Sequence, residues 1–127
     1  MFDREPLATW TDGRVTLLGD AAHPMLQYLA QGACQALEDA MALGIAVDRH
    51  TDHGRLPDGL PSALVAYQEA RIEHASRVQR NARLWGDIWH TNDPLAVTLR
   101  DALFSSLSPD DYRFTDWLYQ PQECTRA

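Results

Sequence analysis

Residues 14–18 (Arg-Val-Thr-Leu-Leu) form a short, mostly apolar and β-branched run that ends at Gly19-Asp20. A run of this kind, bounded by Gly and Asp, predicts one short buried strand. Asp12-Gly13, just before it, is typical of a turn, and residues 2–10 offer at most a weak second strand. Because the backbone groups of a buried strand must be paired, we expect this strand to pair with another copy of the chain or with a sheet that precedes it in a larger protein.

A helical pattern replaces the strand pattern from Gln31 to about Val47. Apolar and small residues recur there at steps of three and four, and further apolar residues extend this surface almost all round, so we expect a largely buried helix. The main stripe consists of Ala33, Leu37, Ala40, Met41, Gly44 and Ile45.

The rest of the chain reads as a polar loop followed by helices. Residues 48–60 predict a surface loop, and Pro61 is well placed at the first position of a helix over 62–89. Caps and prolines predict a third helix over 92–106 and a short last one over 112–118. The long helix is amphipathic, and we expect its charged face, which includes Arg71, Arg77, Arg80 and Arg83, to lie in solvent. Its apolar face carries Leu64, Tyr67, Ile72, Ala75, Val78, Ala82, Trp85 and Trp89.

Composition narrows the classes of function. The chain has 127 residues with 11 basic and 18 acidic side chains, a net charge of −7, which argues against binding nucleic acid mainly through phosphates. No apolar run approaches the roughly 20 residues that cross a bilayer, and residues 1–6 do not resemble a secretory signal. Cys34 and Cys124 are too few and too far apart for a disulfide framework or a four-ligand zinc site. We therefore expect free thiols in a reducing compartment, with the cytoplasm as the default location and no membrane partner.

The segment that carries chemistry runs from Gly19 to Ala40. The strand delivers Asp20 at its carboxyl end, where ligands gather in open α/β proteins, and a carboxylate there accepts hydrogen bonds from sugar or polyol hydroxyls. The amides of Gln31 to Cys34 open the following helix and are free to stabilise an anion or a polarised carbonyl. Gly32 and Ala33 have little or no side chain, so a flat ligand can approach the backbone closely.

This segment resembles the GD motif of single-component FAD-dependent aromatic hydroxylases. The residues that carry the likeness are Gly-Asp-Ala-Ala-His-Pro at 19–24, Gln-Gly at 31–32 and Glu-Asp-Ala at 38–40. Within that family, residues 26–32 look most like salicylate hydroxylase and 3-hydroxybenzoate 6-hydroxylase relatives. The likeness is dense from Arg14 to Ala40 and holds only in kind for the later helices.

The resemblance implies a cofactor and a set of site residues. In the family the motif aspartate, here Asp20 after Gly19, bonds the ribityl chain of FAD, and the amides at the helix start, here around Gln31, Gly32, Ala33 and Cys34, face the flavin pyrimidine edge. The loop between them passes beside the flavin and the aromatic substrate, which makes Gln27 and Tyr28 candidate substrate-lining residues. Such enzymes use NADH or NADPH with FAD and O2 to hydroxylate a phenol ring, and the flavin supplies the oxygen chemistry. No catalytic residue is assigned within this chain.

The chain also departs from the family. It lacks the Gly-x-Gly-x-x-Gly fingerprint for the ADP half of FAD and the central Asp-Gly motif, so it resembles only the C-terminal third of such an enzyme. The fold class implied is a mainly α fragment of an α/β (α+β) flavoprotein hydroxylase fold, with one short buried strand at about 14–18 followed by three or four helices. Residues 1–47 would belong to the FAD-binding domain, 48–60 to a loop and 61–127 to a C-terminal helical part.

Two functions follow as hypotheses. The chain is either the flavin-contacting segment of an FAD-dependent monooxygenase acting on a hydroxybenzoate-like compound, or a truncated, non-catalytic helical module that self-associates or docks on a partner. In either case a homodimer or a missing N-terminal domain is expected to complete it. We expect these 127 residues alone to bind FAD weakly or not at all.

Other polar residues are interpreted structurally. We expect His23 to act as a structural hydrogen-bonding group and Glu38-Asp39 to be a capping or packing anchor. His50-Thr51-Asp52-His53 lacks a further ligand at helical spacing, so no metal site is predicted. Trp85, Trp89, Trp117 and Tyr119 are expected to be packing anchors, although Trp85 and Trp89 could form an exposed ridge.

Overall fold

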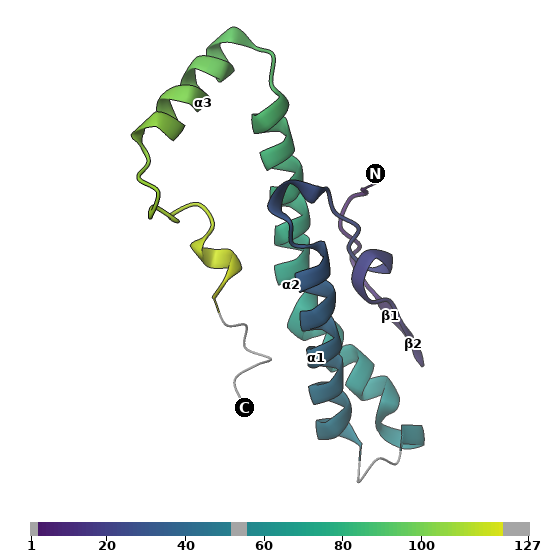
Figure 1. Ribbon diagram of the computed structural model, residues 1–127. Coiled ribbons are helices and arrows are strands. Elements are labelled where there is room, and N and C mark those ends of the chain that lie inside the picture. Colours follow the sequence, from purple (N-terminus) through teal and green to yellow (C-terminus); the bar gives the residue numbers. More distant parts are fainter. Residues whose placement is uncertain (1–2, 52–55, 121–127) are drawn as a thin grey trace.

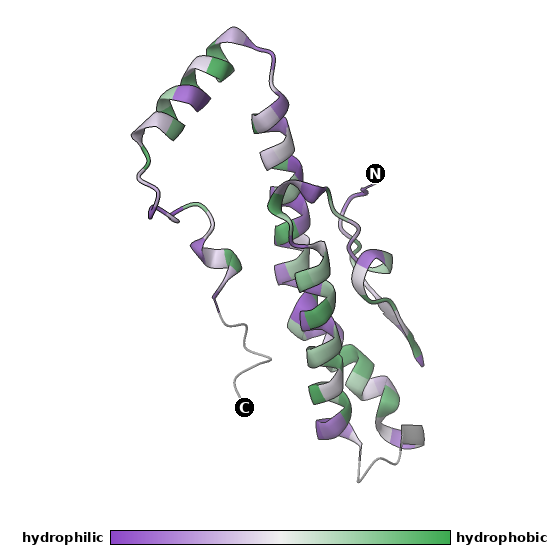
Figure 2. Cartoon of the chain, in the orientation of Figure 1, coloured by the Kyte–Doolittle hydropathy of each residue, from purple (hydrophilic) through white to green (hydrophobic). Residues whose placement is uncertain are grey.

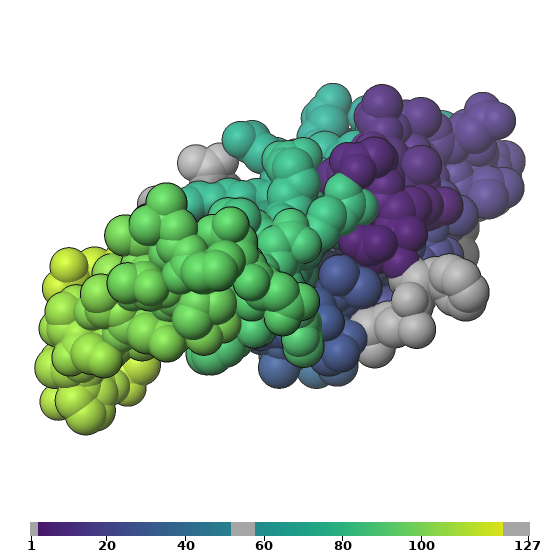
Figure 3. All heavy atoms as spheres, turned by 90° about the horizontal axis from the view of Figure 1, so that it is seen from above, coloured from purple at the N-terminus to yellow at the C-terminus, as the bar shows by residue number. Residues whose placement is uncertain are grey.

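The structure, a computed structural model, describes residues 3–51 and 56–120 (Figure 1). A small hairpin and two 3-10 turns precede two long helices that lie side by side, and a third helix and a final turn form an arm that folds back from the end of the second helix. Seen from above, this arm projects to one side of the molecule while the N-terminal segment covers the other (Figure 3). None of the helices in the described ranges is long and apolar enough to cross a membrane. The elements in chain order are β1 (Thr11–Asp12), β2 (Val15–Thr16), η1 (Gly19–Ala21), η2 (Gln27–Leu29), α1 (Gly32–His50), α2 (Leu56–His90), α3 (Pro94–Ser106) and η4 (Asp116–Leu118).

The predicted strand has a partner within this chain, so the expectation that no other strand of this chain pairs with it is wrong, while pairing with a further sheet or another copy stays a prediction. β2 pairs antiparallel with β1, with Thr11 opposite Thr16. Gly13 takes the positive φ of +56° that two-residue hairpin turns require at their first central position. The prediction of burial is also wrong, because Val15 is 68% exposed. The Asp12-Gly13 turn carried the signal for this hairpin, but each strand is too short to stand out as a pattern.

The face of α1 that is buried is not the one the apolar stripe predicts. Leu37 is 69% exposed and Met41 57% exposed. The residues buried instead, on the side of α1 that contacts α2 and η1, are Gln35, Asp39, Ala42 and Ala46. The helix is therefore largely buried on one side only. Small residues at 42 and 46 let α2 approach, while two polar residues meet polar groups of α2 at the other end of the contact.

Three boundaries differ from the predictions. α1 continues to His50, since polar residues that face solvent with basic groups in the last turn are compatible with a helix end. α2 begins at Leu56, so Pro61 lies inside the helix and the predicted loop is shorter. The last predicted helix is reduced to the turn η4, whereas α3 begins at Pro94 behind its cap Asp93 (Oδ1 to Ala96 N, 2.8 Å) and ends at Ser106 as expected.

The core has two parts. One joins the hairpin, α1 and α2 through Trp10, Ala42 and Tyr67. The other lies beside η2, where Met25 packs with Val78, Ala82 and Leu118, so the C-terminal turn η4 supports the loop before α1. α3 has no buried residue, and hydrophobic positions are visible along it in Figure 2.

Candidate functional site

The segment after β2 turns sharply at Gly19. This residue has a φ of +58°, and a Cβ there would lie 3.3 Å from the Cβ of Ala36 on α1. Its carbonyl accepts hydrogen bonds from the amides of Ala22 (2.9 Å) and His23 (2.8 Å), which closes η1. The turn leaves Gly19 buried and the next residue, Asp20, exposed.

Asp20 faces a groove at the start of α1. A Cβ on Gly32 would lie 4.0 Å from Asp20 Oδ1 and from Met25 Cγ, so the carboxylate and the bare helix start are neighbours across the groove. The groove has a volume of about 570 Å³. It is lined by Asp20, Met25, Leu26, Gln27, Ala30, Gly32, Ala33 and Ala36. Asp20 is the one ionisable residue in this lining.

The first turn of α1 has no side-chain cap. Gln31 precedes the helix without a capping hydrogen bond, and the amide of Gln35 bonds to the carbonyl of Gln31 (2.8 Å). The amides of residues 32–34 come before this bond and lack acceptors one helical turn earlier. They present partial positive charge beside the Asp20 carboxylate.

Four of the residues predicted for this site, Gly19, Gln31, Cys34 and Tyr28, are not part of the groove lining. Gly19 is behind it, Gln31 is buried, and exposed Cys34 is not part of the lining. Gln27 does line the groove. Tyr28 points to α2, where its ring lies 5.3 Å from the ring of His90. The structure places Asp20, Gly32, Ala33 and Gln27 at the groove, and the binding roles of all the predicted site residues stay predictions.

A buried polar network lies directly under the turn. Asp39 of α1 accepts hydrogen bonds from His23 Nε2 (2.6 Å), the amide of Gly19 (3.0 Å) and Arg71 Nε (2.8 Å). Arg71 also binds Glu38 Oε2 (2.6 Å) and Gln35 Oε1 (2.7 Å). The structural interpretations of His23 and of the Glu38-Asp39 pair are confirmed. The placement of Arg71 on a solvated face is wrong, because its side chain is fully buried.

The spacing of apolar residues along α2 does indicate that Arg71 is buried. Arg71 stands four residues after Tyr67 and four before Ala75, and both of these are fully buried. A charged residue in register with an apolar stripe must find partners inside the protein. Its Glu38-Asp39 partners lie on a different helix, which periodicity alone does not reveal.

Asp39 is ionised in this network. Burial opposes its ionisation, but hydrogen bonds from His23, Arg71 and the Gly19 amide outweigh that effect and hold its pKa below the ordinary value of 3.8. His74, on α2, has its pKa lowered from 6.5 by burial and by the nearby charge of Arg71. Its Nε2 is buried and has no hydrogen-bond partner.

The lowered pKa values of His74 and Asp39 predict that the free energy of unfolding falls in acid. The unfolded chain protonates His74 at its ordinary pKa of 6.5 while the folded chain resists, so stability falls as pH drops below about 6.5. The lowered pKa of Asp39 adds a second loss below about 3.8. In urea titrations from pH 8 to pH 4.5, His74→Leu is expected to show a smaller loss of unfolding free energy than the wild type. Parallel curves for the two proteins would contradict the assignment to His74.

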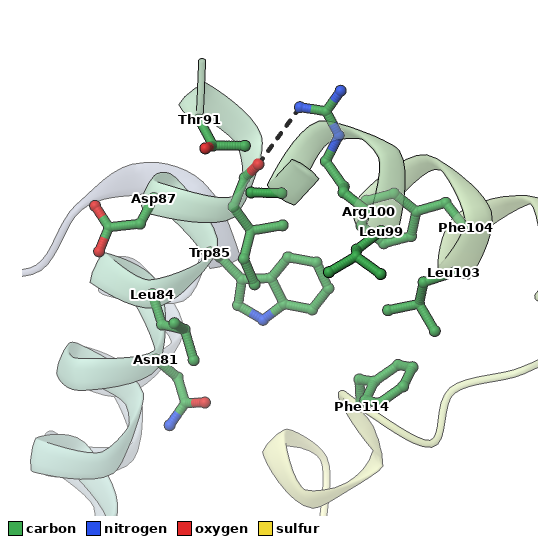
Figure 4. A pocket seen from close by; sticks show the side chains of 12 residues that line it. Asn81, Leu84, Trp85, Asp87, Thr91, Leu99, Arg100, Leu103, Phe104 and Phe114 are labelled. Carbon is green, nitrogen blue, oxygen red and sulfur yellow. Dashed lines mark hydrogen bonds between the residues drawn. The ribbon is translucent and has the colours of Figure 1, made fainter. Parts of the chain in front are cut away.

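A second groove lies between the end of α2 and α3 (Figure 4). It has a volume of about 540 Å³ and is mainly apolar, with Leu99, Leu103 and Phe104 of α3 facing Trp85 of α2. Trp85, Trp89 and Phe104 stack with ring centroids 5.1–6.2 Å apart. The prediction that these tryptophans are packing anchors is confirmed, although Trp89 remains 50% exposed.

The C-terminal anchors behave differently from each other. Trp117 packs on α2, with Arg77 3.9 Å above its ring and His74 at a ring distance of 5.9 Å. Tyr119 is 72% exposed, so its prediction as an anchor is wrong. Asp52, His53 and Cys124 lie outside the described residues.

The chain is similar in sequence to known proteins. Residues 3–82 match the family model described as FAD binding domain. The chain is 43% identical over 120 residues to 3-hydroxybenzoate 6-hydroxylase 1 of Aquipseudomonas alcaligenes, covering 94% of this chain and 29% of that protein. It is 44% identical over 94 residues to the FAD-dependent urate hydroxylase of Mycolicibacterium vanbaalenii, covering 74% and 22%.

Two solved structures are also similar. Klebsiella pneumoniae HpxO complexed with FAD and uric acid has a TM-score of 0.70 at 32% identity, covering 81% of this chain and 25% of that one. A salicylate hydroxylase substrate complex has a TM-score of 0.61 at 34% identity, with the same coverage. The chain thus spans between a fifth and about a third of the length of the relatives it matches.

Proposed function

This chain belongs to the FAD binding domain family, and we propose that it is the C-terminal, flavin-contacting segment of an FAD-dependent monooxygenase that hydroxylates an aromatic, hydroxybenzoate-like compound with NAD(P)H and O2. The observation that carries the proposal is the Asp20 carboxylate facing the bare start of α1 at Gly32. The relatives extend well beyond the matched part, so the complete enzyme needs further polypeptide.

The residues present fit one end of FAD. Asp20 offers an acceptor for the hydroxyls of a ribityl chain, and the free amides of Gly32 and Ala33 offer donors to the carbonyl edge of the ring. Gly32 has no side chain to block a flat ring. When bound, FAD supplies the redox and oxygen chemistry.

The rest of the groove suits an uncharged aromatic surface. Met25, Leu26 and Ala30 are apolar and exclude water from the ring face, while Gln27 adds an amide that can orient a hydroxyl or carboxylate. The choice of a hydroxybenzoate-like substrate is supported by the names of similar proteins, several of which are 3-hydroxybenzoate 6-hydroxylases.

A chimera tests the proposal. The matched 120 residues of 3-hydroxybenzoate 6-hydroxylase 1 are replaced by the corresponding part of this chain, which is 43% identical. We expect the purified chimera to be yellow, to bind FAD and to oxidise NADH or NADPH in the presence of 3-hydroxybenzoate. Asp20→Asn is expected to weaken FAD binding at least tenfold, because a charge-assisted hydrogen bond is lost.

Two matched variants control for general damage. Asp12→Asn changes an exposed carboxylate on the hairpin and should leave FAD affinity unchanged. Gly32→Val places a side chain in the groove and should abolish FAD binding. Gly44→Val, the control for this change, alters another glycine of α1 that has open space around it and should leave FAD binding intact. A folded chimera whose FAD affinity is indifferent to Asp20→Asn and Gly32→Val would refute the proposal.

The alternative function, a non-catalytic helical module that self-associates, is supported by the arm. Leu95 is 67% and Leu99 62% exposed, on a helix with no buried residue. A homodimer would cover this surface, and the free, exposed Cys34 suits the reducing cytoplasm. Sedimentation of the 127-residue chain together with its absorption spectrum distinguishes the cases. A stable colourless dimer that gains no absorbance with added FAD, combined with a colourless chimera, would favour the alternative.

A further inference from the structure

The Asp39 carboxylate joins three separate segments at one point under the groove. It accepts from His23 Nε2 at 2.6 Å, from the Gly19 amide at 3.0 Å and from Arg71 Nε at 2.8 Å. The side chains of His23, Asp39 and Arg71 are at most 1% exposed. We propose that Asp39 is a positioning residue for the flavin site: it fixes the Gly19 turn and so aims Asp20 into the groove. The inference rests on the proposed function.

The turn is closed on the Gly19 carbonyl by the amides of Ala22 and His23, and the Asp39 contact fixes the Gly19 amide as well. Gly19 adopts φ +58°, which a flexible glycine does not hold without restraint, and η1 is only three residues long with no side-chain cap. A second tie comes from Arg4, which donates to the carbonyls of Ala21 and Ala22 on the exposed side. The Asp39 contact is the one that holds the amide of the residue immediately before Asp20.

Asp39 is itself held from two directions. It lies on the buried side of α1, and its Oδ1 accepts a hydrogen bond from Nε of Arg71 on α2. The remaining donors of Arg71 are used by Glu38 and Gln35, so the guanidinium has a single orientation. The paired Asp39 carboxylate therefore links the turn, α1 and α2 in addition to the apolar core that contains Ala22 and Ala42. A buried carboxylate whose hydrogen bonds are all made holds its partners in fixed positions.

A double-mutant cycle on FAD affinity tests this. In the chimera described above, apoprotein is titrated with FAD by fluorescence for wild type, Asp20→Asn, Asp39→Asn and the double variant. Asparagine at 39 carries an NH2 donor in place of one carboxylate oxygen. In the place of Oδ2 this donor faces the Gly19 amide, and in the place of Oδ1 it faces Arg71 Nε, so one of these two hydrogen bonds is lost in either orientation. We expect Asp39→Asn to raise the FAD dissociation constant at least tenfold, and less than twofold when Asp20 is already Asn. Asp48→Asn, an exposed change on the same helix, is the matched control and should have no effect.

Each outcome decides the inference. Additive effects of the two substitutions, or unchanged FAD affinity in Asp39→Asn, would overturn it while leaving the proposed function standing if Asp20→Asn alone weakens binding. An Asp20→Asn variant that binds FAD normally would overturn both. If Asp39→Asn does not fold, the wild-type 127-residue chain supplies the decision by amide hydrogen exchange: the Gly19 amide is expected to exchange at least a hundredfold more slowly than that of Asp20, and equal rates would overturn the inference.

Discussion

Replacing Arg71 by methionine is expected to lower the free energy of unfolding by about 3–5 kcal/mol, the usual cost of removing one partner from a buried ion pair. Arg71 is fully buried and makes contacts with Asp39, Glu38 and Gln35. Methionine has a similar length, so the loss reports the missing donors rather than a large cavity. Without the guanidinium, the buried Asp39 carboxylate keeps only its contacts with the Gly19 amide and His23 Nε2.

Urea denaturation followed by circular dichroism measures this effect. Arg80→Met, an exposed change on the same helix, is the matched control and is expected to shift stability by less than about 0.5 kcal/mol. Adding Asp39→Leu to Arg71→Met removes the stranded carboxylate and should recover part of the loss. A variant Arg71→Met as stable as the Arg80→Met control would mean that the network contributes nothing to the fold.

Two features of this region show how far the sequence predicts the structure: the local order of the motif and the choice of the buried face of α1. The motif at 19–40 correctly placed Asp20 opposite Gly32, because it fixes a local order of turn, loop and helix start. The same pattern could not say which face of α1 is buried. Periodicity shows that Leu37 and Met41 share a face, but whether that face is covered depends on which other polypeptide is present.

In the described residues, α1 buries Gln35 and Asp39 together with Ala42 and Ala46, and it exposes Leu37 and Met41. The two polar residues can be buried because Arg71 donates hydrogen bonds to both, so their burial leaves no unpaired charge. The apolar face, with Leu37 and Met41, continues from the groove residues Ala33 and Ala36. The relatives extend well beyond the matched region, and under the proposed function this apolar face is a surface that the rest of the enzyme could cover.

The position of η2, beside the Asp20 groove, depends on a close contact between Tyr28 and Gly86 that the sequence did not reveal. Gly86 of α2 receives the ring of Tyr28, and a Cβ there would lie 2.4 Å from Tyr28 Cε2. A glycine inside a helix ordinarily weakens it by roughly 0.5–1 kcal/mol relative to alanine, so its presence indicates that space, rather than helix propensity, decides this position. Tyr28 belongs to η2, which also carries the groove residue Gln27.

Gly86→Ala is therefore expected to lower the free energy of unfolding by about 1–3 kcal/mol, as overpacking does, and to displace η2. Gly44→Ala is the matched control: it has open space and should stabilise the chain by up to about 1 kcal/mol through helix propensity alone. Adding Tyr28→Ala to Gly86→Ala should remove the clash and leave the pair less destabilised than the sum of the single changes. In the chimera, the displaced η2 should raise KM for 3-hydroxybenzoate more than it changes FAD affinity, because Gln27 moves while Asp20 stays tied through Gly19 to Asp39. A Gly86→Ala chain that gains stability as Gly44→Ala does would show that the Tyr28 ring yields freely, and that α2 does not hold the loop in place.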